Sequence, residues 1–129
     1  MSPPQLRIEP LGSAKRDGDG WRTTWRVTNV GADPVRIVGA AAPHSRFRGE
    51  STLDREVRGK GSTQISLVAR IEGVAGREIE NAFVILLVQR GDERWRILTR
   101  LRVALDVEAK PHPRVEAVTT QRVGFSGEL

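Results

Sequence analysis

Polar and apolar residues alternate with a period of two along most of this chain. The clearest stretch is residues 94–105, where apolar residues occupy one set of alternate positions and four arginines the other. Successive side chains of a β-strand point to opposite faces, whereas a helix would scatter the arginines around its circumference. The pattern therefore predicts a strand with one buried and one solvated face. The predicted inward set is Trp95, Ile97, Thr99, Leu101, Val103 and Leu105, and the arginines of the outward set are Arg94, Arg96, Arg100 and Arg102.

Residues 82–88 form an apolar run on both faces, which is typical of a central strand covered on both sides. A tight turn at residues 90–93 predicts a hairpin, but its register stays open, and a one-residue slip exchanges the faces. A two-residue Gly91-Asp92 turn places Val84, Leu86 and Val88 beside Trp95 and Ile97. A three-residue loop places Phe83, Ile85 and Leu87 there instead. We slightly favour the loop, because it turns Glu78 and Glu80 outward, which costs less than burying them. In either register an apolar strip lies beside the arginine row.

The same alternation predicts further strands over residues 5–11, 21–30, 35–42 and 63–71. Pro4 and Pro10 bracket the first, as suits an edge strand, and Trp25 is expected in the core. Residues 44–60 are irregular, so we expect only a short strand or loop there. The total is about seven strands without a helix, the number expected of a sandwich or barrel. The sequence thus predicts an all-β fold.

The region around residues 27–37 resembles the strand–turn–strand segment of bacterial immunoglobulin-like modules, which often carry an Asn-x-Gly turn before an apolar strand. Residues 59–67 are similar to the later glycine-containing turn and strand of the same modules. The resemblance implies an immunoglobulin-like antiparallel β-sandwich, and such modules usually serve adhesion, spacing or protein docking. On this basis residues 1–106 form the sandwich domain, and residues 107–129 are a C-terminal tail or an added strand.

Composition narrows the functional classes. The 129 residues suffice for one domain with its own core, and the absence of cysteine excludes disulfides and thiol chemistry. Net charge is +5, and lysine occurs only at Lys15, Lys60 and Lys110, so most of the 21 basic residues are arginine. No secretory signal or apolar span is visible, and we expect a cytoplasmic protein that does not insert into a membrane.

Candidate chemistry is sparse. His44 and His112 have no partner at metal-ligand spacing, and no phosphate-binding loop or nucleophile elbow occurs, so we expect no cofactor, no metal and no enzymatic activity. The tripeptide Arg90-Gly91-Asp92 matches an adhesion motif, but it lies where the hairpin needs a turn.

Arginine is the remaining signal. Arg22 and Arg26 share the outer face of one strand, and four more arginines share the outer face of residues 94–105. We expect a non-enzymatic module that acts through protein–protein contact or self-association, at the apolar strip and its arginine rim. The alternative is binding of nucleic acid or another anion through an arginine-rich sheet face, if the two strands are neighbours. The predicted binding residues are Arg22, Arg26, Arg94, Arg96, Arg100 and Arg102.

Overall fold

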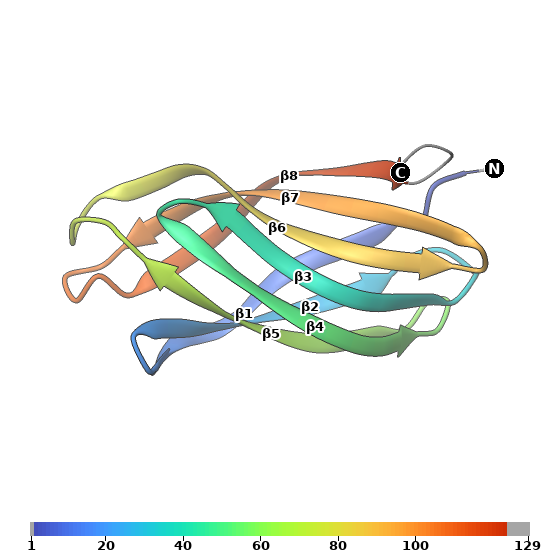
Figure 1. Ribbon diagram of the computed structural model, residues 1–129, viewed down its shortest axis with the longest axis horizontal. Helices are drawn as coiled ribbons and strands as arrows, with labels where there is room; N and C mark the ends of the chain where they lie inside the picture. Colours follow the sequence, from blue (N-terminus) through green and yellow to red (C-terminus); the bar gives the residue numbers. More distant parts are fainter. Residues whose placement is uncertain (1, 124–129) are drawn as a thin grey trace.

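The computed structural model describes residues 2–123, which form eight antiparallel strands joined by short turns (Figure 1). This confirms the all-β prediction. The strands are β1 (Leu6–Asp17), β2 (Gly20–Asn29), β3 (Val35–His44), β4 (Phe47–Val57), β5 (Ser62–Ile71), β6 (Glu78–Arg90), β7 (Glu93–Leu105) and β8 (Pro111–Val123).

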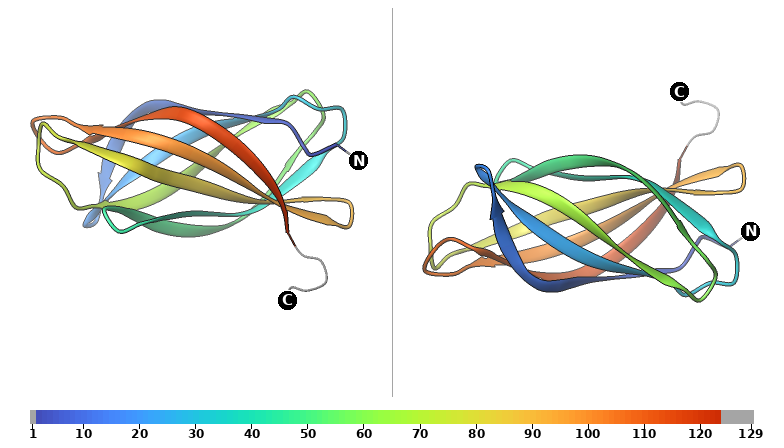
Figure 2. Two further views of the ribbon diagram at one scale, coloured as in Figure 1. Left: turned by 90° about the horizontal axis from the view of Figure 1, so that it is seen from above. Right: turned by 90° about the horizontal axis from the view of Figure 1, so that it is seen from below.

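The immunoglobulin-like sandwich was the wrong architecture. All eight strands belong to one sheet in the order β1-β2-β5-β4-β3-β6-β7-β8, and the sheet curls strongly into a half-barrel. Figure 2 shows β6, β7 and β8 foremost from one side of the molecule and β1, β2 and β5 from the other. The curl brings the inner faces of both flanks onto one core. Two separate sheets are therefore not needed to bury the alternating apolar residues.

Pairing between β4 and β5 makes the sheet continuous. It involves only the pairs Phe47↔Ile71 and Arg48↔Arg70. Directly after it, Gly49 lies so close to β5 that a Cβ atom there would be 2.1 Å from the carbonyl oxygen of Val68. A side chain at this position would push the strands apart, so the glycine permits this close approach of β4 to β5.

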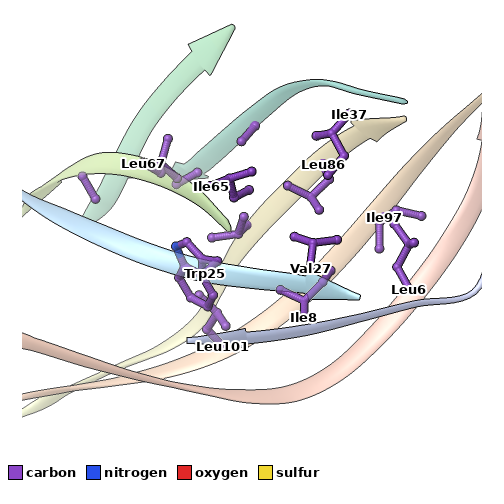
Figure 3. Close-up of a cluster of buried hydrophobic side chains, with 14 of the residues drawn as sticks. Leu6, Ile8, Trp25, Val27, Ile37, Ile65, Leu67, Leu86, Ile97 and Leu101 are labelled. Atoms are coloured by element: carbon purple, nitrogen blue, oxygen red, sulfur yellow. The ribbon is translucent and has the colours of Figure 1, made fainter. Parts of the chain in front are cut away.

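The core is built from inward residues of β1 to β7 (Figure 3), and the partly buried Val115 of β8 packs against it. Trp25 of β2 is fully buried, as predicted, and Trp95 of β7 is 7% exposed. The inward positions predicted for residues 94–105 are all buried, and so are Trp21, Thr23, Trp25 and Val27 of β2. The period-two assignment of faces is therefore confirmed for both strands.

The β6–β7 hairpin has the register that we did not favour. Arg90 pairs with Glu93 and Val88 with Trp95, so the turn is the two residues Gly91-Asp92, with Gly91 at φ +59°. Val84, Leu86 and Val88 are accordingly buried. This register was expected to bury Glu78 and Glu80. They are not buried, because a bulge between Ile79 and Ala82 shifts the register. Asn81 holds this bulge at φ +58°, and Glu78 and Glu80 stay exposed.

Two further expectations are corrected or resolved. The irregular stretch 44–60 contains an 11-residue strand, β4, rather than a short strand or loop. Residues 111–123 form β8, which pairs with β7 along its length, so these residues are an added strand and not a tail. β8 extends the sheet beside β7 and does not lie across the apolar strip. Residues 124–129 of the same predicted tail lie outside the described part of the chain.

β1 lies at the edge of the sheet, as its prolines predicted.

Candidate interaction surface

An apolar patch crosses the outer face of β3, β6 and β7. Ile85 of β6 is paired with Ala41 of β3 on one side and with Leu98 of β7 on the other. The next outward residue of β6, Leu87, lies between Gly39 and Arg96 and is 42% exposed. We call this patch the outer strip, and it comprises Gly39, Ala41, Phe83, Ile85, Leu87 and Leu98. It is the apolar strip predicted beside the arginine row.

The arginine row of β7 is divided into two halves by its carboxylate neighbours. Arg102 contacts Glu78 at 3.0 Å and Glu116 at 3.1 Å, and hydrogen bonds, first to Glu78 and then to Glu116, raise its pKa. Arg100 also lies 3.8 Å from Glu116. At the other end, Arg94 and Arg96 are exposed, and neither forms an ion pair with any residue between 2 and 123. Uncompensated positive charge on β7 is thus confined to the half nearest the Gly91 turn.

Arg22 and Arg26 do not join this row. They point outward from β2, which is flanked by β1 and β5, whereas β7 is flanked by β6 and β8. The two strands lie on opposite sides of the molecule (Figure 2). Arg22 is also ion-paired with Asp17 across the β1–β2 turn. The condition for a combined basic face, that the two strands are neighbours, is therefore not met.

Sequence reasoning missed an acidic row on the opposite flank of the outer strip. Asp54 and Glu56 of β4 face outward, with side chains 77% and 60% exposed, and both contact Arg36 of β3. Glu50 is exposed on the same face of β4, opposite Ala41. The signal was present as acidic residues at alternate positions, but residues 44–60 had not been read as a long strand. The outer strip therefore has an acidic flank on β4 and a basic flank on β7.

The arginine of the predicted adhesion tripeptide is engaged internally. Arg90 donates hydrogen bonds from Nε and Nη2 to Glu93, and Nη2 also donates to the backbone oxygen of Ser2. Its guanidinium lies over the ring of Trp95, and its side chain is only 14% exposed. These contacts secure the end of the hairpin and occupy the side chain that an adhesion receptor would have to recognise.

Both histidines lie at strand ends and contact residues of the adjoining turns. Nδ1 of His44 accepts the backbone N–H of Arg46 between β3 and β4, at 3.0 Å. His112 Nε2 lies 3.0 Å from Asp106 Oδ2, and Asp106 Oδ1 accepts the backbone N–H groups of Glu108 and Lys110. The hydrogen bond with His112, followed by that with Lys110, lowers the pKa of Asp106 to about 2. Among residues 2–123, no group of three or more potential ligands could hold a metal ion.

The described segment contains no helix that could cross a membrane. In comparisons with known proteins, no family model matches the chain, and no curated protein matches it significantly in sequence.

Proposed function

We propose that this protein is a non-enzymatic interaction module that binds a protein surface through the outer strip. The observation that carries the proposal is Leu87, a large apolar side chain 42% exposed at the centre of a sheet face. Ile85 and Leu98 adjoin it, and Arg94 and Arg96 border it without a carboxylate partner among the described residues. Apolar patches with a polar rim are typical of protein-binding sites.

Capture from native lysate tests this proposal. The tagged protein is compared with Leu87→Asp, and the matched control is Val74→Asp, since Val74 is 67% exposed on the β5–β6 turn, away from the outer strip. We expect specific partners, including untagged copies of this chain, to be retained by the wild type and by Val74→Asp and lost with Leu87→Asp. Equal recovery by all three proteins would contradict the proposal.

The alternative, anion or nucleic-acid binding, now has weaker support. Arg22 and Arg26 face away from β7, and Arg100 and Arg102 contact glutamates, so Arg94 and Arg96 are the members of the predicted set that remain. Binding of this kind weakens steeply as salt concentration rises, because counterions are released. A mobility-shift series at increasing salt compares the wild type with the Arg94→Ser/Arg96→Ser variant. Nucleic-acid binding that weakens with salt and is lost in the variant would indicate this alternative function.

A further inference from the structure

We infer that the partner of the outer strip is a second copy of this chain, related by a half turn about an axis that runs parallel to the strands, between β3 and β6. The inference rests on the proposed function and adds the identity of the partner and its orientation. In this arrangement β3 of one copy faces β6 of the other, and β4 faces β7. Such a two-fold contact requires a surface that is complementary to itself.

The apolar residues of the outer strip can meet in this arrangement. Leu87 pairs with Gly39 and Ile85 with Ala41. Within one copy Leu87 already covers Gly39, since a Cβ atom there would be 3.4 Å from Leu87 Cδ1. The half turn keeps the level along the strands and exchanges β3 and β6, so the Leu87 side chains of the two copies lie next to each other across the axis.

The charges have the same symmetry. Glu56, Arg36, Gln89 and Arg94 are successive partners across β4, β3, β6 and β7, so the ends of this row carry opposite charges. The half turn places Glu56 of one copy over Arg94 of the other, at both rims of the contact. Asp54 adds a second exposed carboxylate on the acidic rim, and Arg96 a second cation on the basic rim. Arg36 contacts both carboxylates and offsets one of their two charges, so the acidic rim keeps a net negative charge. Complementary rims of this kind select the orientation of a complex.

The face-to-face arrangement with the other in-plane axis lacks this match. A half turn about an axis that runs across the strands would place β4 over β4 and β7 over β7. An axis at the level of Arg96 would set Arg96 against its own copy, and an axis midway between Arg94 and Arg96 would set each of them against the other. Like charges facing each other are unfavourable, so of these two orientations the strand-parallel axis is the one that brings opposite charges together.

Charge reversal tests the pairing in purified protein. Sedimentation velocity from about 10 μM to about 1 mM is expected to show a reversible dimer for the wild type. Arg94→Glu/Arg96→Glu makes both rims acidic, and Asp54→Lys/Glu56→Lys makes both basic, so each variant should dimerise at least about tenfold more weakly. An equimolar mixture of the two should form a heterodimer. The control Arg22→Glu/Arg26→Glu carries the same charge change on the far side of the molecule and should dimerise like the wild type.

Cross-linking tests the orientation. The chain has no cysteine, and Thr52 and Arg96 lie at one level on β4 and β7, three strand spacings or about 14 Å apart within a copy. The half turn places Thr52 of one copy opposite Arg96 of the other, and sets the two copies of either residue about that far apart laterally. Packed sheet faces lie about 10 Å apart, which is beyond the reach of a disulfide. With a short bismaleimide cross-linker of about 8–10 Å, a mixture of Thr52→Cys and Arg96→Cys should therefore give a covalent dimer, whereas either variant alone should give little.

Three results would overturn the inference: a wild type that is monomeric at 1 mM, charge variants that dimerise like the wild type, or no heterodimer in the mixture. Circular dichroism and thermal melting show whether each variant is folded, and the mixture restores pairing only if both are. A different result would contradict the proposed function, namely lysate capture that does not depend on Leu87. If the purified protein is monomeric but lysate capture still depends on Leu87, the surface binds a different protein, and only the inference is lost.

Discussion

The indole Nε1 of Trp95 donates a hydrogen bond to Oε1 of Glu93 at 3.0 Å, between two residues on the inner face of one strand. Glu93 is 8% exposed and also accepts hydrogen bonds from Arg90. The bonds from Trp95 and then Arg90 lower the pKa of Glu93, so the carboxylate stays charged at the edge of the core. This group closes the end of the half-barrel beside the Gly91 turn.

Replacing Glu93 tests the role of that closure. Glu93→Ala leaves the buried indole N–H without its acceptor and should lower the melting temperature, whereas Glu93→Gln retains a neutral acceptor and should fall between alanine and the wild type. Because the folded pKa is depressed, the advantage of the wild type over Glu93→Gln should be present above the ordinary pKa of 4.5 and disappear as pH falls below it. Equal melting temperatures for the three proteins at pH 7 would contradict the assignment.

Two buried threonines provide a matched pair. Thr23 Oγ1 donates to the backbone oxygen of Leu67 and accepts from Trp25 Nε1, whereas Thr99 Oγ1 is buried without a partner among the described residues. Thr99→Val should therefore raise the free energy of unfolding by about 1 kcal/mol, and Thr23→Val should lower it by about 1–3 kcal/mol. Urea denaturation measures both changes. If both substitutions changed the free energy of unfolding in the same direction, the assignment of Thr99 as unpaired and Thr23 as hydrogen-bonded would be wrong.

The Asp106–His112 contact predicts a dependence of stability on pH. The pKa of Asp106 is lowered from 3.8 to about 2, so the carboxylate contributes stability above pH 3.8, and this contribution is lost as pH falls through about 2. Asp106→Asn removes the titration. The stability of the wild type should fall more steeply than that of the variant between these two values, as followed by chemical denaturation at each pH. Parallel curves would mean that Asp106 does not titrate differently in the folded and unfolded states.

Gly49→Ala tests the continuity of the sheet. The added methyl group would overlap the carbonyl of Val68, so we expect a loss of about 1–3 kcal/mol and faster amide hydrogen exchange near Phe47 and Ile71. Gly31→Ala is the control, since a Cβ there would be an ordinary 3.5 Å from the Asn29 side chain. Equal stability of the two variants would indicate that β4 and β5 do not approach closely at Gly49.

The hairpin register illustrates how a local feature misled the sequence argument. Uninterrupted alternation from Val88 back to Glu78 would bury both glutamates in the two-residue-turn register, and this cost favoured the other one. The bulge at Asn81 removes the conflict, because one extra residue reverses the alternation within β6. Asparagine tolerates positive φ better than most residues, so Asn81 was a readable signal. Its side-chain type alone, however, does not show that the strand bulges there.

Period-two alternation determined by itself which side chains face inward, including Trp25, Trp95 and the arginines of β7, since side-chain direction is a property of a single strand. It also located the apolar strip, half of the proposed surface. Which strands are neighbours depends on contacts between distant segments, so only the tertiary structure decided the sheet order, the close approach of Gly49 to Val68 and the separation of Arg26 from Arg94. The same alternation fits two packed sheets or one curled sheet, because both bury one face of each strand. The acidic flank on β4 became part of the surface only when the fold placed it two strands from β6.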